Sequence, residues 1–274
     1  MKTPRRPIEL LGFFGLTLLL GSCGNPLSQF TTKLTVSVSA PTQLTAGTCG
    51  SSHAIELTLM AVDGTTAIVA SVDTVVSPTL SNGGSPLNTA DFYSDPTCQD
   101  SSLSFTVKAG STKVTLYPKV KLAGSPSFAF ASTQLSVAGT WTPTVTAATL
   151  GGLKWKTYPG ILTTQVANAV FTSNPAVQFT DAYGNEITDT CCSVQLTAYT
   201  DGTCTTVVPS TGVAPALYGT LSAGTNPIST PANGLATFSN VRFNNFGTIY
   251  LKTSVSGTTS SYTSPCLGPF TVLP

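Results

Sequence analysis

The stretch GTIYLKTSVSG, residues 247–257, places an apolar side chain at almost every second position. A two-residue alternation is the pattern of a β-strand with one face buried and the other in water. The same period occurs at 33–40, 54–62, 103–110, 113–120, 126–132, 176–182, 193–200 and 235–243. Clusters of Gly, Pro, Asn and Ser separate these stretches, as turns between strands require. The sequence therefore predicts an all-β protein built from sandwiches.

An internal repeat predicts two such sandwiches in tandem. The segment SVSAPTQLTAGTCGSSHAIELTLMAVDGTTAIV from residue 37 has a looser counterpart, KTYPGILTTQVANAVFTSNPAVQFTDAYGNEIT, from residue 156. The small, polar stretch TAATLGG at 146–152 has the composition of a short linker. We therefore expect sandwiches at 33–148 and 149–274 that fold separately.

The first 22 residues have the features of a secretory signal peptide: basic residues, then an apolar run over 10–20, then small residues. The ending Leu20-Gly21-Ser22-Cys23 resembles the lipobox of bacterial lipoproteins. That resemblance implies cleavage before Cys23, acylation (palmitate or a similar chain) at this residue, and a lipidated tether over 23–32. With Gly24 next in the chain, it also implies an outer-membrane location in the cell envelope. Ordinary signal cleavage, with a cysteine there by chance, is the alternative.

The charge of the chain excludes some partners. Only 8% of residues are charged, and 12 Lys and Arg nearly balance 11 Asp and Glu. Proteins that bind nucleic acid present a basic patch or stripe, which this composition does not supply. The expected membrane contact is the lipid anchor alone.

Six further cysteines predict disulfides formed in an oxidising compartment. They are Cys49, Cys98, Cys191, Cys192, Cys204 and Cys266. Cys49 and Cys98 pair if the sandwiches fold alone. In the second sandwich a bond between the neighbours Cys191 and Cys192 is the least expected, because adjacent strand positions face opposite ways. We favour Cys192 with Cys266 and Cys191 with Cys204, with the swapped pairing as the alternative.

Two motifs carry a family resemblance. The stretch PAVQFTDAYGNEITD (175–189) contains Asp181, Gly184 and Asn185, and NGLATFSNVRF (233–243) follows it. The second motif contributes Asn233, Gly234, Ala236 and Phe238. Together they resemble the immunoglobulin-like repeats of bacterial surface proteins of the invasin and intimin type. The first sandwich matches more loosely, with Asp63-Gly64 at the corresponding turn. The resemblance implies an immunoglobulin-like fold and a surface location, and no activity.

Candidate catalytic and metal-binding groups are few. The lone histidine, His53, has no G-x-S-x-G elbow to serve, and no phosphate-binding or dinucleotide motif occurs. We therefore expect no enzyme and no cofactor. Calcium needs six to eight oxygen ligands, more than Asp181, Glu186 and Asp189 supply. The same holds for the set Asp91, Asp95 and Asp100, so we expect no metal and assign both sets to turns.

Aromatic residues flank the linker and are the candidate ligand contacts. Trp141, Trp155 and Tyr158 would stack on sugar rings if they were exposed in a row, although packing at a junction or core is the preferred explanation. The sequence thus predicts a non-catalytic, lipid-anchored surface protein with an adhesive or structural display role. Its partner would be a surface glycan or a protein bound by loops of the second sandwich. A carbohydrate-binding module of the cell surface is the alternative.

Overall fold

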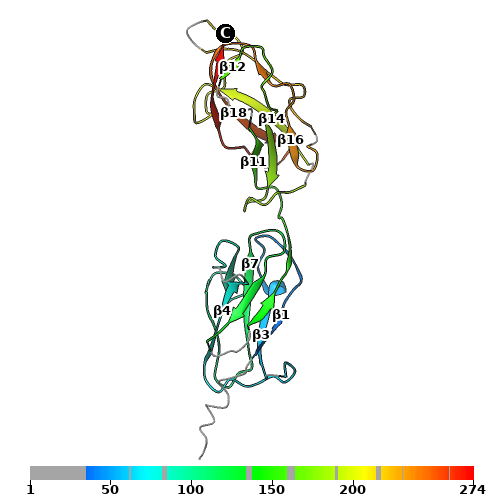
Figure 1. Cartoon of the computed structure of the whole chain (residues 1–274), viewed down its shortest axis with the longest axis vertical. Helices are drawn as coiled ribbons and strands as arrows, with labels where there is room; N and C mark the ends of the chain where they lie inside the picture. Colours follow the sequence, from blue (N-terminus) through cyan, green and yellow to red (C-terminus); the bar gives the residue numbers. More distant parts are fainter. Residues whose placement is uncertain are drawn as a thin grey trace, which may run out of the picture.

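The computed structural model shows two β-sandwiches placed end to end and joined by one chain segment (Figure 1). It describes residues 35–61, 63–81, 85–133, 138–158, 164–188, 191–213, 217–229, 231–258 and 260–274. The expected signal peptide, Cys23 and the tether lie outside these described residues. Within them, no helix has the length and apolar character needed to cross a membrane.

The first sandwich consists of two four-stranded sheets. Its strands are β1 (Thr35–Ser39), β2 (Gln43–Thr45), β3 (Ile55–Met60), β4 (Thr74–Leu80), β5 (Ala90–Tyr93), β6 (Phe105–Val107), β7 (Lys113–Val120), β8 (Phe128–Ala131), β9 (Gly139–Trp141) and β10 (Thr144–Thr146). One sheet has the order β1-β3-β7-β5 and the other β6-β4-β8-β9, while β2 pairs in parallel with β10. A short 3₁₀ turn, η1 (Ser51–His53), precedes β3.

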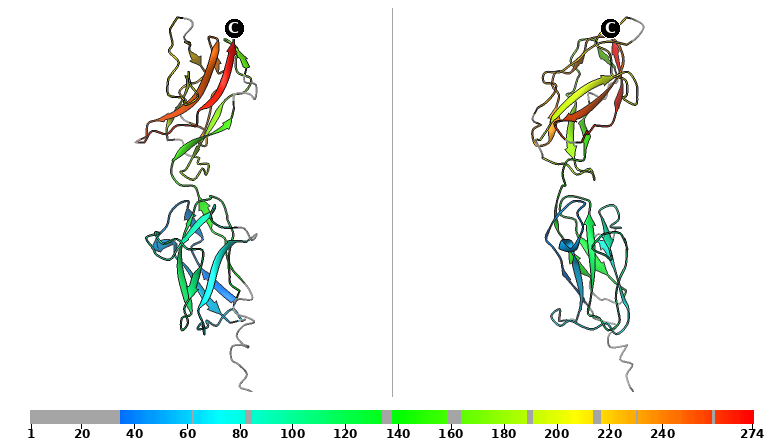
Figure 2. Two further views of the ribbon diagram at one scale, coloured as in Figure 1. Left: turned by 90° about the vertical axis from the view of Figure 1, so that its left-hand side faces the viewer. Right: turned by 180° about the vertical axis from the view of Figure 1, so that it is seen from behind.

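The second sandwich packs a three-stranded sheet against a four-stranded one (Figure 2). Its strands are β11 (Gly152–Thr157), β12 (Thr164–Val166), β13 (Ala176–Thr180), β14 (Ser193–Tyr199), β15 (Leu221–Ser222), β16 (Leu235–Thr237), β17 (Arg242–Phe243), β18 (Gly247–Ser256) and β19 (Leu267–Leu273). The sheet orders are β11-β13-β16 and β12-β19-β18-β14, with β15 and β17 forming a short pair.

Both sandwiches divide their opening segment between two sheets. In the first, β1 runs antiparallel to β3 while β2 runs parallel to the final strand β10. In the second, β11 runs antiparallel to β13 while β12 runs parallel to the final strand β19. In the larger sheet of the second sandwich, the last two strands, β18 and β19, follow β14 in the order β14-β18-β19. Strands C, F and G of an immunoglobulin domain are arranged in the same order. The sequence repeat thus corresponds to a repeated strand arrangement, and the predicted all-β class is confirmed.

Alternating apolar residues from facing sheets fill two separate cores. In β18, Ile249, Leu251 and Val255 point inward, as the alternation predicted. The first core is centred on aromatic rings, with Phe92 edge-on to Phe128 at 5.5 Å between ring centroids. The two core clusters have no buried residue in common. Separate folding of the two sandwiches stays a prediction.

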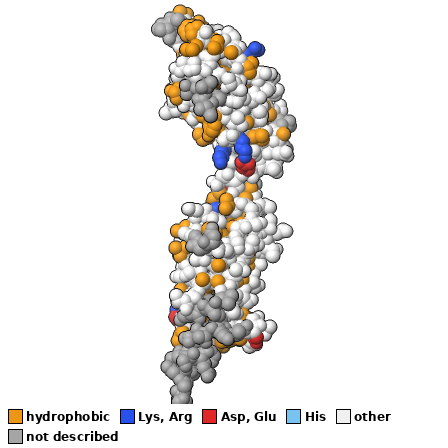
Figure 3. Space-filling model, in the orientation of Figure 1, with side chains coloured by type: hydrophobic (Ala, Val, Ile, Leu, Met, Phe, Trp, Pro, Cys, Tyr) orange, Lys and Arg blue, Asp and Glu red, His pale blue; other side chains and the backbone are white. Residues whose placement is uncertain are grey.

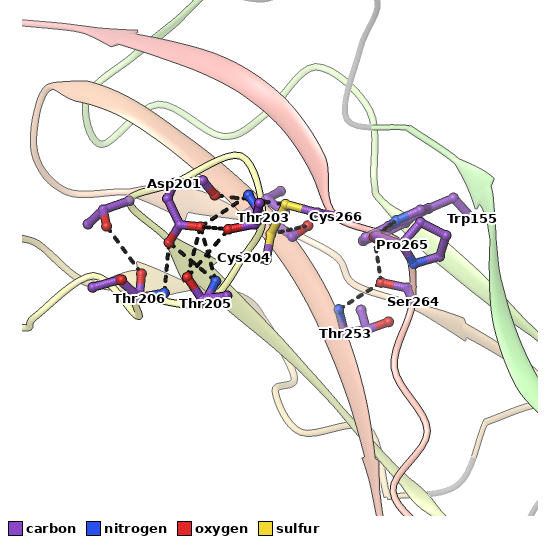
Figure 4. The surroundings of a disulfide bond; sticks show 12 residues. Trp155, Asp201, Thr203, Cys204, Thr205, Thr206, Thr253, Ser264, Pro265 and Cys266 are labelled. Atoms are coloured by element: carbon purple, nitrogen blue, oxygen red, sulfur yellow. Dashed lines mark hydrogen bonds between the residues drawn. A yellow bond between two sulfur atoms is a disulfide. The ribbon is translucent and has the colours of Figure 1, made fainter.

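The predicted bond between Cys49 and Cys98 is confirmed, with 6.5 Å between the two Cα atoms. The predicted pairing in the second sandwich is wrong. There Cys191 bonds to its neighbour Cys192. The other bond joins Cys204 to Cys266 (Figure 4). Cys192 does face the core, as its parity with the apolar residues of β14 predicted.

The pairing was wrong because Cys266 was expected at the end of the sandwich where β14 begins, and it lies near the other end. After β18 the chain turns back along that strand, so that Tyr262 O accepts from Val255 N and Ser264 N donates to Thr253 O. Cys266 therefore arrives beside the middle of β18, near the far end of β14, where Cys204 lies. Cys192 precedes the other end of β14, about 20 Å away at ~3.3 Å per residue. Cys191 and Cys192 differ in burial as the alternation predicted, but they precede β14 and the backbone bends at Cys192, so the bond between them does not have to form within a regular strand.

Candidate functional site: the junction between the sandwiches

The loop Asp181-Ala-Tyr-Gly-Asn185 follows β13 and forms the turn that its sequence predicted. The Asp181 carboxylate accepts hydrogen bonds from Tyr183 N at 2.8 Å and from Asn185 N at 3.0 Å. Gly184 has a φ of 86°, in the left-handed region that glycine adopts without strain. The loop is therefore held in one shape by its own aspartate.

Asn185 carries the contact from this loop to the first sandwich. Its Oδ1 accepts from Ala123 N at 2.9 Å, and its Nδ2 donates to Lys121 O at 2.7 Å. A side-chain amide has one acceptor and one donor group, and here both are matched by main-chain groups across the junction. Because Asn185 is buried, loss of either bond would leave a polar group without water to replace it.

Asp181 also reaches beyond its own turn. Its Oδ2 accepts from Ala148 N in the linker at 3.0 Å and from Asn185 Nδ2 at 2.8 Å. Burial opposes ionisation of this carboxyl group, but the hydrogen bonds from Asn185, Ala148 and Tyr183 outweigh it and lower its pKa. The charged form is therefore the one that fits the junction.

Two glycines allow the chain segments to approach one another here. A Cβ on Gly47, in the first sandwich, would lie 2.1 Å from the Tyr183 ring, so the ring would have to move. A Cβ on Gly151, in the linker, would lie 2.4 Å from Ala182 N. Both positions thus accept close contact with the Asp181 loop.

The corresponding loop of the first sandwich, at Asp63, has the aspartate but not the asparagine that contacts the other sandwich. Asp63 accepts from Thr65 N and Thr66 N, and these bonds lower its pKa to about 2. It is followed by Gly64-Thr65-Thr66, with no asparagine to reach outward. The signal for the junction was therefore present in the sequence as the asparagine of D-x-x-G-N, which turn chemistry alone did not explain.

The carboxylates considered for calcium have other partners. Asp181 is occupied by four N–H donors, and Glu186 forms an exposed ion pair with Lys156. Asp189 lies outside the described residues. Among the residues that the structure describes, no three His, Cys, Asp or Glu side chains gather as a metal site.

The aromatic residues near the linker are not grouped. Trp141 and Trp155 are each 6% exposed and belong to different cores. Their indole N–H groups donate to Pro41 O and Pro265 O, both at 2.9 Å. Trp141 also stacks on Phe128, so both tryptophans contribute to packing and neither offers an open face to a sugar. Tyr158 is exposed, and His53 contacts the hydroxyls of Ser52 and Thr48.

Sequence reasoning missed a hairpin that occurs once in each sandwich. Tyr-Ser-Asp-Pro-Thr-Cys at 93–98 and Tyr-Thr-Asp-Gly-Thr-Cys at 199–204 fold alike. In each, the aspartate accepts from backbone N–H groups two to five residues later, and the cysteine has positive φ. The signal was the shared Asp-x-Thr-Cys spacing. Each hairpin holds one cysteine of a long-range disulfide in place. Figure 4 shows the second hairpin, with Asp201 beside the bond between Cys204 and Cys266.

No protein-family model matches the chain, and no curated protein matches it. Among solved structures, the D0–D1 domains of intimin are similar at 19% identity over 88% of this chain and 98% of that chain, with a TM-score of 0.27. The adhesin InvE of Yersinia pseudotuberculosis is similar at 17% identity over 85% of this chain and 57% of that chain, with a TM-score of 0.29. Domains 4–9 of the surface-layer protein SbsC are similar at 16% identity over 87% of this chain and 31% of that chain, with a TM-score of 0.26. At such TM-scores the immunoglobulin-like character of this chain rests on its own strand pairing.

Proposed function

We propose that this chain is a lipid-anchored protein of the bacterial cell surface, in which the first sandwich holds the second away from the membrane in an adhesive or display role. The observation that carries the proposal is the junction. Asn185 and Asp181 fix the second sandwich to Lys121, Ala123 and Ala148 through buried hydrogen bonds. A joint of this kind suits a spacer that must present its outer end in a constant direction.

The direction of the chain supports the same proposal. The strands β1 to β10 form the first sandwich, and the chain then passes through the second sandwich to its C-terminal end on the side away from the first (Figure 1). An anchor at Cys23 would place the first sandwich near the bilayer, because residues 24–32 reach about 30 Å at most when extended. The second sandwich would then face outward.

The anchor is tested by changing Cys23 to Ala in the full precursor. We expect incorporation of labelled fatty acid to be lost and the precursor to remain uncleaved or to be mis-sorted. Ser22→Ala is the matched control, because it keeps a small residue before the cysteine and should leave labelling intact. Unchanged labelling in Cys23→Ala would reject the lipoprotein assignment.

A further inference from the structure

A hollow of about 450 Å³ lies in the first sandwich, between β5 and the hairpin that follows it. Small-molecule sites in proteins are concave and span roughly 300–1,000 Å³, so the hollow has the size of a ligand site. The residues of its lining that matter here are Leu87, Asp91, Tyr93, Gln99, Ser101 and Leu103. The proposed function gives these residues no role.

The hairpin at 93–102 forms one wall of the hollow and is held in place at its base and at its cysteine. At the base, Ser102 N donates to Phe92 O at 2.8 Å. Further along, Cys98 lines the hollow and is bonded to the segment before β3. Cys98 is half-buried, whereas its counterpart Cys204 in the second sandwich is 3% exposed. The same hairpin therefore packs down in the second sandwich and stands further off in the first.

The opposite wall is organised by Lys121, directly after β7. Its Nζ forms an ion pair with Asp91, at 2.8 Å from Oδ1, and donates to Leu87 O at 3.5 Å. The hydroxyl of Tyr93 donates to the same carboxylate at 3.5 Å. The main-chain O of Lys121 accepts from Asn185 at the junction, which fixes this residue from a second side. A wall that is ordered before the ligand arrives lowers the cost of binding.

The polar groups of the hollow suit a partner that both donates and accepts hydrogen bonds. The ionised carboxylate of Asp91 is an acceptor with about four lone-pair sites, more than Lys121 and Tyr93 occupy. The Gln99 amide and the Ser101 hydroxyl can each donate and accept. Neither of these two side chains has a hydrogen-bond partner among the residues that the structure describes. Both are exposed, so they are available to a ligand.

The hollow combines these groups with apolar walls and no net charge. Leu87 and Leu103 are each 49% exposed and line it together. Because Lys121 neutralises Asp91, charge favours neither an anion nor a cation there. Charged side chains are also few on the face shown in Figure 3. The matching ligand is therefore uncharged, carries several hydroxyl groups and has apolar C–H surfaces, and neutral sugars combine these properties.

We propose that this hollow binds a neutral sugar unit of a glycan. The contact is small, so a single sugar should bind with a dissociation constant in the millimolar range. Many copies on one surface act together, and such multivalency raises the overall affinity by about 10²–10⁴. In the cell this site would give the proposed adhesive role a ligand. Its test uses the soluble chain, so the outcome is independent of acylation at Cys23.

The test titrates the methyl glycosides of glucose, galactose, mannose and N-acetylglucosamine into the isotope-labelled chain of residues 24–274, followed by amide NMR shifts. The variant Gln99→Ala, Leu103→Ser removes one polar group and one apolar wall of the hollow. Both side chains are exposed, so the fold should be kept. The control Gln43→Ala, Val69→Ser makes the same kinds of change at exposed positions of the same sandwich outside the hollow.

We expect at least one of the four glycosides to shift the amide signals of Leu87, Asp91 and residues 99–103. The variant should bind that glycoside at least tenfold more weakly, and the control should bind it as the unchanged chain does. Circular dichroism melts check that all chains are folded equally, and Gln99→Ala alone is measured beside the double variant in case the latter melts early.

Three results would overturn the proposal. The first is that none of the four glycosides shifts the signals of the hollow. The second is equal affinity in the unchanged chain and the variants, because the sugar would then bind elsewhere. The third is tighter binding of glucuronate or glucosamine than of the neutral glycosides, because charge would then select the ligand.

Discussion

At the scale of single residues, Asn185 does more than complete a turn. It joins two sandwiches by matching one N–H and one C=O of the facing main chain, with Asp181 holding its amide in position. Each such hydrogen bond contributes a net free energy of about 0.5–1.5 kcal/mol. The orientation of the two sandwiches thus rests on the buried hydrogen bonds of Asn185 and Asp181.

Replacing Asn185 by Ala should therefore free the joint. We expect the distribution of distances between spin labels on the two sandwiches to broaden, with a loss of about 1–3 kcal/mol of junction stability from two missing bonds. Glu186→Gln is the control, because its ion pair with Lys156 is exposed and such pairs contribute little. A distance distribution as narrow as that of the unchanged protein would show that Asn185 does not hold the joint.

At the scale of elements, the Asp-x-Thr-Cys hairpins predict a pH dependence of the stability of the fold. In the first, hydrogen bonds from Thr97, Asp100 and Gln99 lower the pKa of Asp95 from 3.8 to about 2. In the second, bonds from Thr203, Thr206 and Thr205 lower the pKa of Asp201. A carboxyl group whose pKa is lowered by folding stabilises the fold above its unfolded pKa, and this contribution is lost as the pH falls through the folded value.

We therefore expect the melting temperature to fall between pH 4 and pH 2, the interval set by the ordinary and lowered pKa values of Asp95. Asp95→Asn should lower the melting temperature at pH 6, since an amide nitrogen would face the N–H groups of Gln99 and Asp100. The difference between variant and unchanged protein should shrink toward pH 2. A difference that stays constant with pH would contradict this role of the carboxylate.

Strand prediction from the sequence succeeded where alternation was long. The stretches at 113–120, 193–200 and 247–257 match β7, β14 and β18 almost residue for residue. It failed for the three-residue strands β2 and β12, which are too short to show a period, and for β4 and β19, whose prolines interrupt the pattern. The junction was missed for another reason. Its bonds join residues about sixty positions apart, and no local pattern encodes which loop a given asparagine will meet.

At the scale of the whole molecule, two cores without a shared residue predict independent folding. Fragments 33–148 and 149–274, expressed with their disulfides oxidised, should each melt cooperatively and give a β-type circular dichroism spectrum. The first fragment should lose about 4 kcal/mol of stability on reduction of the Cys49–Cys98 bond, by the loop-entropy estimate for about fifty residues. A fragment that remains disordered would mean that the sandwiches depend on each other.

The two long-range disulfides also limit how far the protein can be drawn out by force. A load applied between an anchored start and a held tip extends only the residues outside covalently closed loops. The bonds remove 49 residues of the first sandwich and 62 of the second from that length. At about 3.5 Å per extended residue, the closed loops shorten the fully extended chain by roughly 170 Å in the first sandwich and 220 Å in the second. A chain pulled until both sandwiches have unfolded would therefore remain shorter than its full contour length, and a reducing agent would lengthen it.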